Sequence, residues 1–310
     1  MKKRKFTAAV FLSLFLCGCT TGSDKITEQV QQTETTDNNY IFSDISTAAP
    51  LTEESVPAES TPETVHGNAH DINGKTVFVS IFANDTETSW DYENEDEVRT
   101  MYQTLSYLQI AADWLKQQID SYGGNAEFVL DWETNQDLFY GANFYQQMIR
   151  EDSTCYNDQK YFIEKYIDSD SIMEKYNADN ILYLFFFNSS FSNHANSCAS
   201  PPVSIYGEKY STEFINIFVR FDDTHIASPS VYAHEILHAF GAHDLYYANN
   251  AISEEYVNYC IETNSNDIMY TVSDDEVIIN ELSELDAYYI GLVDSSEDVT
   301  KWNLMPSEYE

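Results

Sequence analysis

His234-Glu235-Ile236-Leu237-His238-Ala239-Phe240-Gly241-Ala242-His243-Asp244 is the stretch that decides how this chain folds and what chemistry it offers. Side chains four residues apart lie on one face of an α-helix, so the imidazoles of His234 and His238 can bind one metal ion. Glu235 follows the first histidine, where its carboxylate can take a proton from a water bound to that ion. A surface helix that carries two histidines by chance is the alternative, and the rest of the chain argues against it.

The helix that carries this motif is expected to run from about Ser228 or Ser230 to Phe240. Ser230 suits the N-cap position, and Gly241 suits the left-handed C′ position at which many helices end. Because Gly241 allows a sharp turn, the residues directly after it can come back towards the metal. A third ligand is therefore expected close behind the helix.

The pattern His234-Glu235-x-x-His238-x-x-Gly241-x-x-Asp244 resembles that of the metzincin clan of zinc peptidases. The resemblance implies that Zn²⁺ is held by His234, His238 and Asp244, with Glu235 as the general base. Most of the clan has histidine as the third ligand, and Asp244 matches the snapalysin-like minority. A carboxylate oxygen is an ordinary zinc donor, so this departure is chemically sound.

Other residues compete with Asp244 for the third position. His243 lies one residue early for the clan pattern, and consecutive residues in a turn usually point apart. A more distant carboxylate would take the role if the site resembled a gluzincin, and the candidates are Glu254, Glu255 and Glu262. Replacing each residue with alanine and measuring bound zinc would decide among them.

A second motif, Asn266-Asp267-Ile268-Met269-Tyr270, begins 28 residues after His238. It resembles the methionine turn of metzincins, which implies that Met269 packs as a hydrophobic floor beneath the three ligands. Tyr270 is then expected to point its hydroxyl at the metal or at the oxyanion of the reaction. A plain core methionine and a tyrosine on the rim are the alternatives. Asp267 is expected to cap the turn.

The hydrophobic pattern predicts an α/β or α+β fold, because strands alternate with helices. We expect a mostly parallel twisted sheet with an antiparallel edge strand, the active-site helix and a smaller C-terminal helical subdomain. An edge strand beside the metal could accept an extended peptide by strand addition. Strands are expected at residues 75–82, 126–130, 181–187, 203–206 (the edge) and 214–219, helices at 96–121 and 282–291, helical pieces within 143–176, and a loop at 188–202.

Residues 1–19 have the charged start and the short apolar stretch of an export signal. The sequence Leu16-Cys17-Gly18-Cys19 resembles the lipobox of bacterial lipoproteins, which implies cleavage before Cys19 and acylation of its thiol. An ordinary signal peptide is the alternative. We expect the protein to be anchored by its acyl chains on the outer face of the bacterial cytoplasmic membrane.

Residues 20–73 are rich in Ser, Thr, Glu and Pro, and such a segment buries too little apolar surface to fold. We interpret it as a disordered tether, with a propeptide as the alternative, and residues 74–310 as the zinc peptidase domain. Removal of residues 1–18 would change the net charge from −37 to −41, because they carry four positive charges and no negative one. So acidic a surface makes nucleic acid an improbable partner.

Three cysteines remain in the body of the chain, Cys155, Cys198 and Cys260. They lack the paired spacing of a zinc-thiolate site, so we expect buried apolar groups and at most one disulfide. We expect a monomer, although no feature of the sequence sets the oligomeric state.

Together these patterns predict a zinc-dependent metalloendopeptidase that hydrolyses extracellular proteins or peptides. Two alternatives belong to other classes. One is a tethered, non-catalytic lipoprotein that binds a peptide or a metal on a peptidase fold. The other is a zinc amidohydrolase that acts on a non-peptide substrate.

Overall fold

The computed structural model describes residues 72–130, 134–148, 153–190, 198–200, 214–220 and 225–307. The chain divides into two compact units, Met1–Asn38 and Asn39–Glu310, and every described residue belongs to the second. The export signal, Cys19, most of the tether and the expected strand at 203–206 therefore lie outside the described residues. Within the described part, no helix is both long enough and apolar enough to span a membrane.

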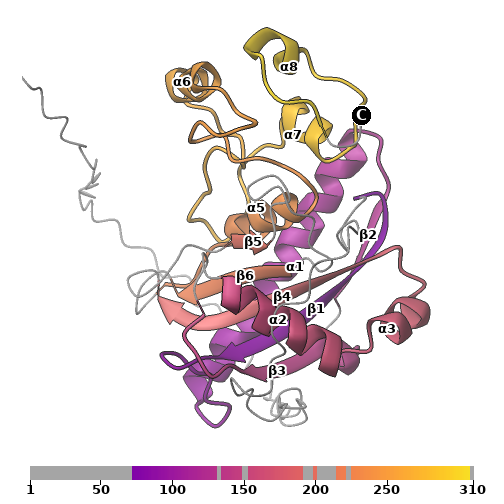
Figure 1. Ribbon diagram of the computed structural model, residues 1–310, viewed down its shortest axis with the longest axis vertical. Helices are drawn as coiled ribbons and strands as arrows, with labels where there is room; N and C mark the ends of the chain where they lie inside the picture. Colours follow the sequence, from indigo (N-terminus) through magenta and orange to yellow (C-terminus); the bar gives the residue numbers. More distant parts are fainter. Residues whose placement is uncertain are drawn as a thin grey trace, which may run out of the picture. The chain divides into compact units, whose positions relative to one another are not determined.

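A single mixed sheet forms the centre of the fold (Figure 1). Its order is β2-β1-β4-β6-β5, and β3 also pairs with β1. All these pairs are parallel except β5 with β6, which is antiparallel at the edge. The expected α/β class with an antiparallel edge strand is confirmed. The strands are β1 (Gly74–Asn84), β2 (Ala126–Val129), β3 (Phe139–Asn143), β4 (Asn180–Ser190), β5 (Cys198–Ser200) and β6 (Phe214–Arg220).

An antiparallel edge strand lies within a segment that was expected to be a loop. Residues 188–202 were expected to form a loop, but β4 continues to Ser190 and β5 occupies Cys198–Ser200. Ser200 pairs with Phe214 of β6. Strand formation here depends on hydrogen bonds to β6, and local composition does not report such partners.

Helices cover both faces of the sheet, which is why its central strands are apolar throughout. Phe186 of β4 packs on Tyr232 of α5 (Pro229–Ala239), with ring centroids 6.1 Å apart. Phe185, whose side chain points to the opposite face, meets Phe162 of α2 (Ser153–Tyr166) at 6.2 Å. The helix α1 (Glu95–Ser121) packs beside α5, and α3 (Ser169–Tyr176) contacts β4 (Figure 1).

The C-terminal part is built from short helices, as expected. They are α6 (Glu254–Thr263), α7 (Glu284–Tyr289) and α8 (Glu297–Trp302). Ser283 and Asp286 form the capping box that begins α7. At the other end of α7, Gly291 has a φ of 77°. Cys155 and Cys260 are buried thiols, and the side chain of Cys198 is outside the described structure.

Candidate metal centre

The motif helix α5 has the earlier of its two expected starts, and the N-cap expected at Ser230 is wrong. Ser228 is the N-cap residue and Pro229 takes the first helical position, so Ser230 lies inside the helix. The Ser230 hydroxyl is buried and bonds the Ser273 hydroxyl at 2.8 Å and Asn280 Oδ1 at 3.2 Å. Ser228 donates to the carbonyl of Ser273 at 2.5 Å. Both serines therefore tie the start of α5 to the segment after the turn that carries Met269.

Gly241 ends α5 in the left-handed region, as expected. Its φ is 105°, a conformation that costs little only for glycine. The Gly241 amide donates to the carbonyl of His238 at 3.0 Å, and the Ala242 amide donates to that of Leu237 at 3.1 Å. This pair of bonds is a Schellman motif, which reverses the chain at the end of a helix. The reversal brings Asp244 back to the histidines.

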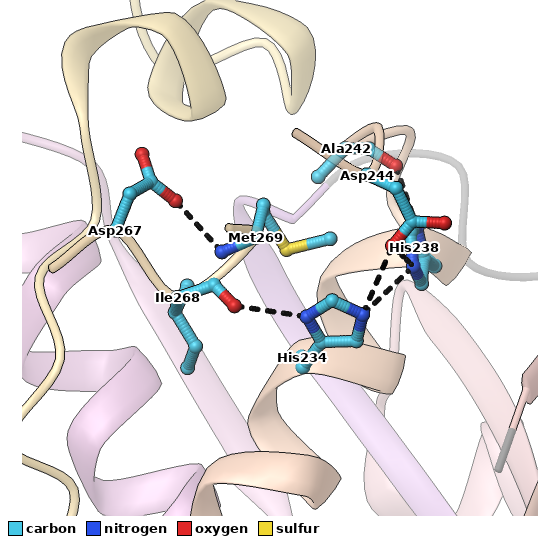
Figure 2. Close-up of polar contacts among 7 residues, drawn as sticks. All are labelled: His234, His238, Ala242, Asp244, Asp267, Ile268 and Met269. Carbon is cyan, nitrogen blue, oxygen red and sulfur yellow. Dashed lines mark hydrogen bonds and ion pairs between the residues drawn. The ribbon is translucent and has the colours of Figure 1, made fainter. Parts of the chain in front are cut away.

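His234, His238 and Asp244 converge on one point (Figure 2). The Nε2 atoms of the two histidines are 3.1 Å apart, and Asp244 Oδ1 lies 3.2 Å from the first and 3.1 Å from the second. Ligands placed tetrahedrally at about 2.0–2.1 Å from zinc are about 3.3 Å apart. The donor set and its spacing therefore fit a zinc ion with a fourth position left open.

Hydrogen bonds on the far side of each ring orient both histidines. His234 Nδ1 lies 2.9 Å from the carbonyl of Ile268, and His238 Nδ1 lies 2.8 Å from that of Ala242 (Figure 2). A carbonyl only accepts, so each Nδ1 must carry a proton. In the neutral rings, Nε2 then offers its lone pair to a metal.

Without a metal, Asp244 and His238 form a buried ion pair. Burial disfavours the imidazolium, but the hydrogen bond and charge of Asp244, helped by Glu235, raise the pKa of His238 to about 9. Burial would likewise raise the pKa of Asp244, yet hydrogen bonds from both histidines hold it well below its usual range. His234, His238 and Asp244 can therefore bind a metal cation in place of the proton on His238.

The other candidates for the third ligand lie outside the cluster of His234, His238 and Asp244. His243 packs its ring edge-on against Tyr289, with centroids 4.7 Å apart, and burial lowers its pKa to about 4. Glu254, Glu255 and Glu262 are exposed on α6. None of these four residues belongs to the group that His234, His238 and Asp244 form.

Met269 lies on a turn that touches the site from a different part of the chain (Figure 2). Its side chain is fully buried, and its amide donates to Asp267 Oδ1 at 2.7 Å, so Asp267 caps the turn as expected. The carbonyl of Met269 accepts from the amide of Leu245, directly after Asp244, at 2.9 Å. Tyr270 is half-buried. Its expected role towards the metal or an oxyanion stays a prediction.

Tyr246 is a residue that sequence reasoning missed. Its ring stacks on that of His234 with centroids 6.4 Å apart, and its hydroxyl is hydrogen-bonded to the Asp244 carboxylate. Burial, followed by the negative charge and hydrogen bond of Asp244, raises the pKa of Tyr246 far above its usual range. Its position two residues after Asp244, on the reversed chain, was the signal that could have found it.

Comparisons with known proteins add little. No family model matches the sequence, and no curated protein matches it. The model is similar to the crystal structure of metalloproteinase-II from Bacteroides fragilis, with 15% sequence identity and a TM-score of 0.36. That match covers 74% of this chain and 55% of the other. With a TM-score this low, the similarity says nothing about the function of this chain.

Proposed function

We propose that this protein is a zinc-dependent metallopeptidase that hydrolyses peptide bonds in protein or peptide substrates. The supporting observation is the triangle of His234 Nε2, His238 Nε2 and Asp244 Oδ1, with sides of 3.1–3.2 Å. Glu235 follows the first of these ligands and is itself buried, at 6% exposure. A buried carboxylate beside an open metal position is what hydrolysis by an activated water requires.

When bound, zinc would lower the pKa of a coordinated water and polarise the substrate carbonyl. Glu235 would accept the proton of the attacking water and pass it to the leaving nitrogen. A tyrosine hydroxyl would donate a hydrogen bond to the oxyanion. Tyr270 is the candidate from the sequence, but we favour Tyr246, because its hydroxyl already lies at Asp244 and its side chain is 47% exposed.

Cleavage of a mixed peptide library by the zinc-loaded protein, read by mass spectrometry, tests this proposal. New peptide termini should appear with the wild type and not with Glu235→Ala, while both proteins bind one zinc. Zinc binding without cleavage by either would favour the non-catalytic binding protein. Cleavage of non-peptide amides alone would favour the amidohydrolase.

We further propose that the protein is exported and held on the outer face of the bacterial cytoplasmic membrane through an acylated Cys19. The support is the sequence Leu16-Cys17-Gly18-Cys19 and the polar segment 20–73 that follows it. Fractionation of cells that make the wild type or Cys19→Ser tests this assignment. The wild type should stay with membranes and carry a lipid mass at its N-terminus, and the variant should do neither.

A further inference from the structure

Two buried carboxyl groups lie beside the turn that carries Met269. Asp267 belongs to that turn and is 8% exposed, and Asp286 in the first turn of α7 is 0% exposed. Each also holds the backbone around it. Asp267 Oδ1 accepts from the Met269 amide (Figure 2), and Asp286 completes the capping box with Ser283. Neither residue has a part in the mechanism proposed above.

The two carboxyl groups are hydrogen-bonded to each other. Two ionised carboxylates can only accept, so this bond requires a proton on one of them. Asp286 Oδ1 is buried and receives no hydrogen bond from an N–H or O–H group of the described residues. The other oxygen, Asp286 Oδ2, accepts from the Ser283 amide over a long 3.4 Å, whereas Asp267 Oδ1 accepts from the Met269 amide at 2.7 Å. The proton therefore belongs to Asp286, and Asp267 is the ionised acceptor.

The surroundings favour this assignment. Burial, then the charge and hydrogen bond of Asp267, raise the pKa of Asp286 well above its usual range. No Lys or Arg in the described part of the chain forms an ion pair with either carboxyl group. The titratable groups that interact electrostatically with the pair are Tyr122 after α1, His234 of α5, Tyr256 and Cys260 of α6, and Tyr289 of α7. Three further acidic residues act on the same tyrosines and on Cys260, namely Glu281, Glu284 and Asp298.

We propose that Asp267 and Asp286 share one proton and act as positioning residues that hold the Met269 turn against His234. Ile268 connects the carboxyl pair to the metal site, because it lies between Asp267 and Met269 in the turn. The carbonyl oxygen of Ile268 lies 2.9 Å from His234 Nδ1. The orientation of one proposed ligand thus depends on a bond that exists only while the proton is bound. The inference rests on the proposed metal site for its effect on zinc, but the shared proton is independent of that site.

Urea unfolding of the metal-free full chain between pH 5 and 9 tests the shared proton. Asp286 keeps its proton in the folded state but releases it on unfolding, because the pKa of an unfolded aspartate is about 3.9. At pH values below the pKa of Asp286 in the folded protein, the equilibrium constant for unfolding of the wild type should therefore rise about tenfold per pH unit. The rise is measured relative to Asp286→Asn, whose amide cannot ionise. The exposed neighbour variant Glu284→Gln should follow the wild type. Parallel curves for the wild type and Asp286→Asn would overturn the proposal.

Zinc affinity at pH 7, measured by competition with a fluorescent chelator, tests the positioning role. Asp286→Asn keeps a donor towards Asp267 and should bind zinc within about threefold of the wild type, whereas Asp286→Leu should bind about 10–100-fold more weakly. Equal weakening in both variants, or none in Asp286→Leu, would refute the role. If Asp286→Leu does not fold, the zinc affinity of Asp286→Asn and the pH dependence of urea unfolding decide whether the proposal holds. Failure of the wild type to bind zinc would instead refute the proposed metal site.

Discussion

A carboxylate as the proposed third ligand would change the electrostatics of the site. Asp244 brings a negative charge to the two histidines, and Glu235 adds another close by. Zinc held by two neutral imidazoles and Asp244 would carry one positive charge fewer than zinc held by three imidazoles. The site should therefore polarise a substrate carbonyl less strongly, and a tyrosine donor gains importance for the oxyanion.

The first prediction concerns the choice of third ligand. Asp244→Ala should weaken zinc binding by more than about 100-fold, since even the loss of an outer hydrogen-bond partner costs about 10–100-fold. His243→Ala is the matched control from the next position, and it should bind zinc nearly as well as the wild type. Equilibrium dialysis against a zinc buffer measures both. Zinc retained by Asp244→Ala and lost by His243→Ala would reverse the assignment.

The second prediction concerns pH. A raised pKa of about 9 means that His238 is protonated in the metal-free protein at pH 7, and this proton must leave before zinc binds. Zinc affinity should therefore rise about tenfold per pH unit up to roughly pH 9 through this group. Calorimetry at pH 7 in two buffers of different ionisation enthalpy should detect about one proton released per zinc from this group. Release of no proton would show that His238 is neutral beforehand.

The third prediction separates the two tyrosines. Removing a donor to the oxyanion costs about 10²–10³ in kcat. Tyr246→Phe should show this loss with KM and bound zinc little changed, because the phenyl ring still packs on His234. Tyr270→Phe should stay close to the wild type. The opposite result would return the role to Tyr270.

Sequence reasoning reached some site residues and not others, for physical reasons. His234, Glu235 and His238 follow from helical periodicity, which is a local property. Asp244 follows from the turn that Gly241 permits. Tyr246 was missed because its contact with Asp244 depends on the chain reversal after Gly241 and not on helical periodicity. The pair of carboxyl groups of Asp267 and Asp286 was missed because the two residues are 19 positions apart in the sequence and come together only in the folded chain.

At the scale of elements, the end of α5 is as important as its histidines. Gly241 holds the left-handed conformation that turns the chain from His238 to Asp244. An L-residue in that conformation costs roughly 1–2 kcal/mol. Any relaxation of this strain would move Asp244 away from the two histidines.

The fourth prediction follows from this turn. Gly241→Ala should lower the free energy of unfolding by about 1–2 kcal/mol and also weaken zinc binding. Gly291→Ala is a close control, because Gly291 has a φ of 77° and ends α7 with the same pair of backbone bonds. It should cost similar stability without changing zinc affinity. Urea unfolding and dialysis measure the two effects, and equal zinc affinity in both variants would contradict the role of Gly241.

Most elements of the sheet could be expected from the sequence, and the exceptions share one cause. The apolar runs of β1, β4 and β6 are long enough to identify a buried strand from their residues alone. β5 is three residues long and β3 contains a glycine, so neither has a strong local preference. Both form because a neighbouring strand offers hydrogen bonds.

At the scale of the molecule, the hydrophobic core contains none of the proposed metal ligands. The residues buried around β1 and β4 form one hydrophobic cluster, and the proposed ligands lie on α5 and on the turn after it. Folding should therefore precede zinc binding. The metal then adds stability by binding only the folded state.

The fifth prediction tests this order. A chelator should abolish peptide cleavage and lower Tm by about 8–16 °C, because zinc at about 1,000 times its Kd adds about 4 kcal/mol and each kcal/mol shifts Tm by about 2–4 °C in a domain of this size. The metal-free protein should still unfold cooperatively and keep its far-ultraviolet circular dichroism. Loss of that signal on chelation would show that the sheet needs the metal, and readdition of zinc should restore Tm in the wild type but not in Asp244→Ala.

The strand β4 is covered by helices on both faces, and its apolar sequence affects how the chain behaves before it folds. Residues Ile181–Phe187 are seven apolar residues without a charge, and such a segment readily associates with copies of itself. In the native sheet it pairs with β1, where Thr76 lies opposite Asn180, so a loop of about a hundred residues must close before this pair forms. Until then, the net charge of −37 is the main force that keeps unfolded chains apart. High salt should therefore favour aggregation during refolding more than it affects the finished protein.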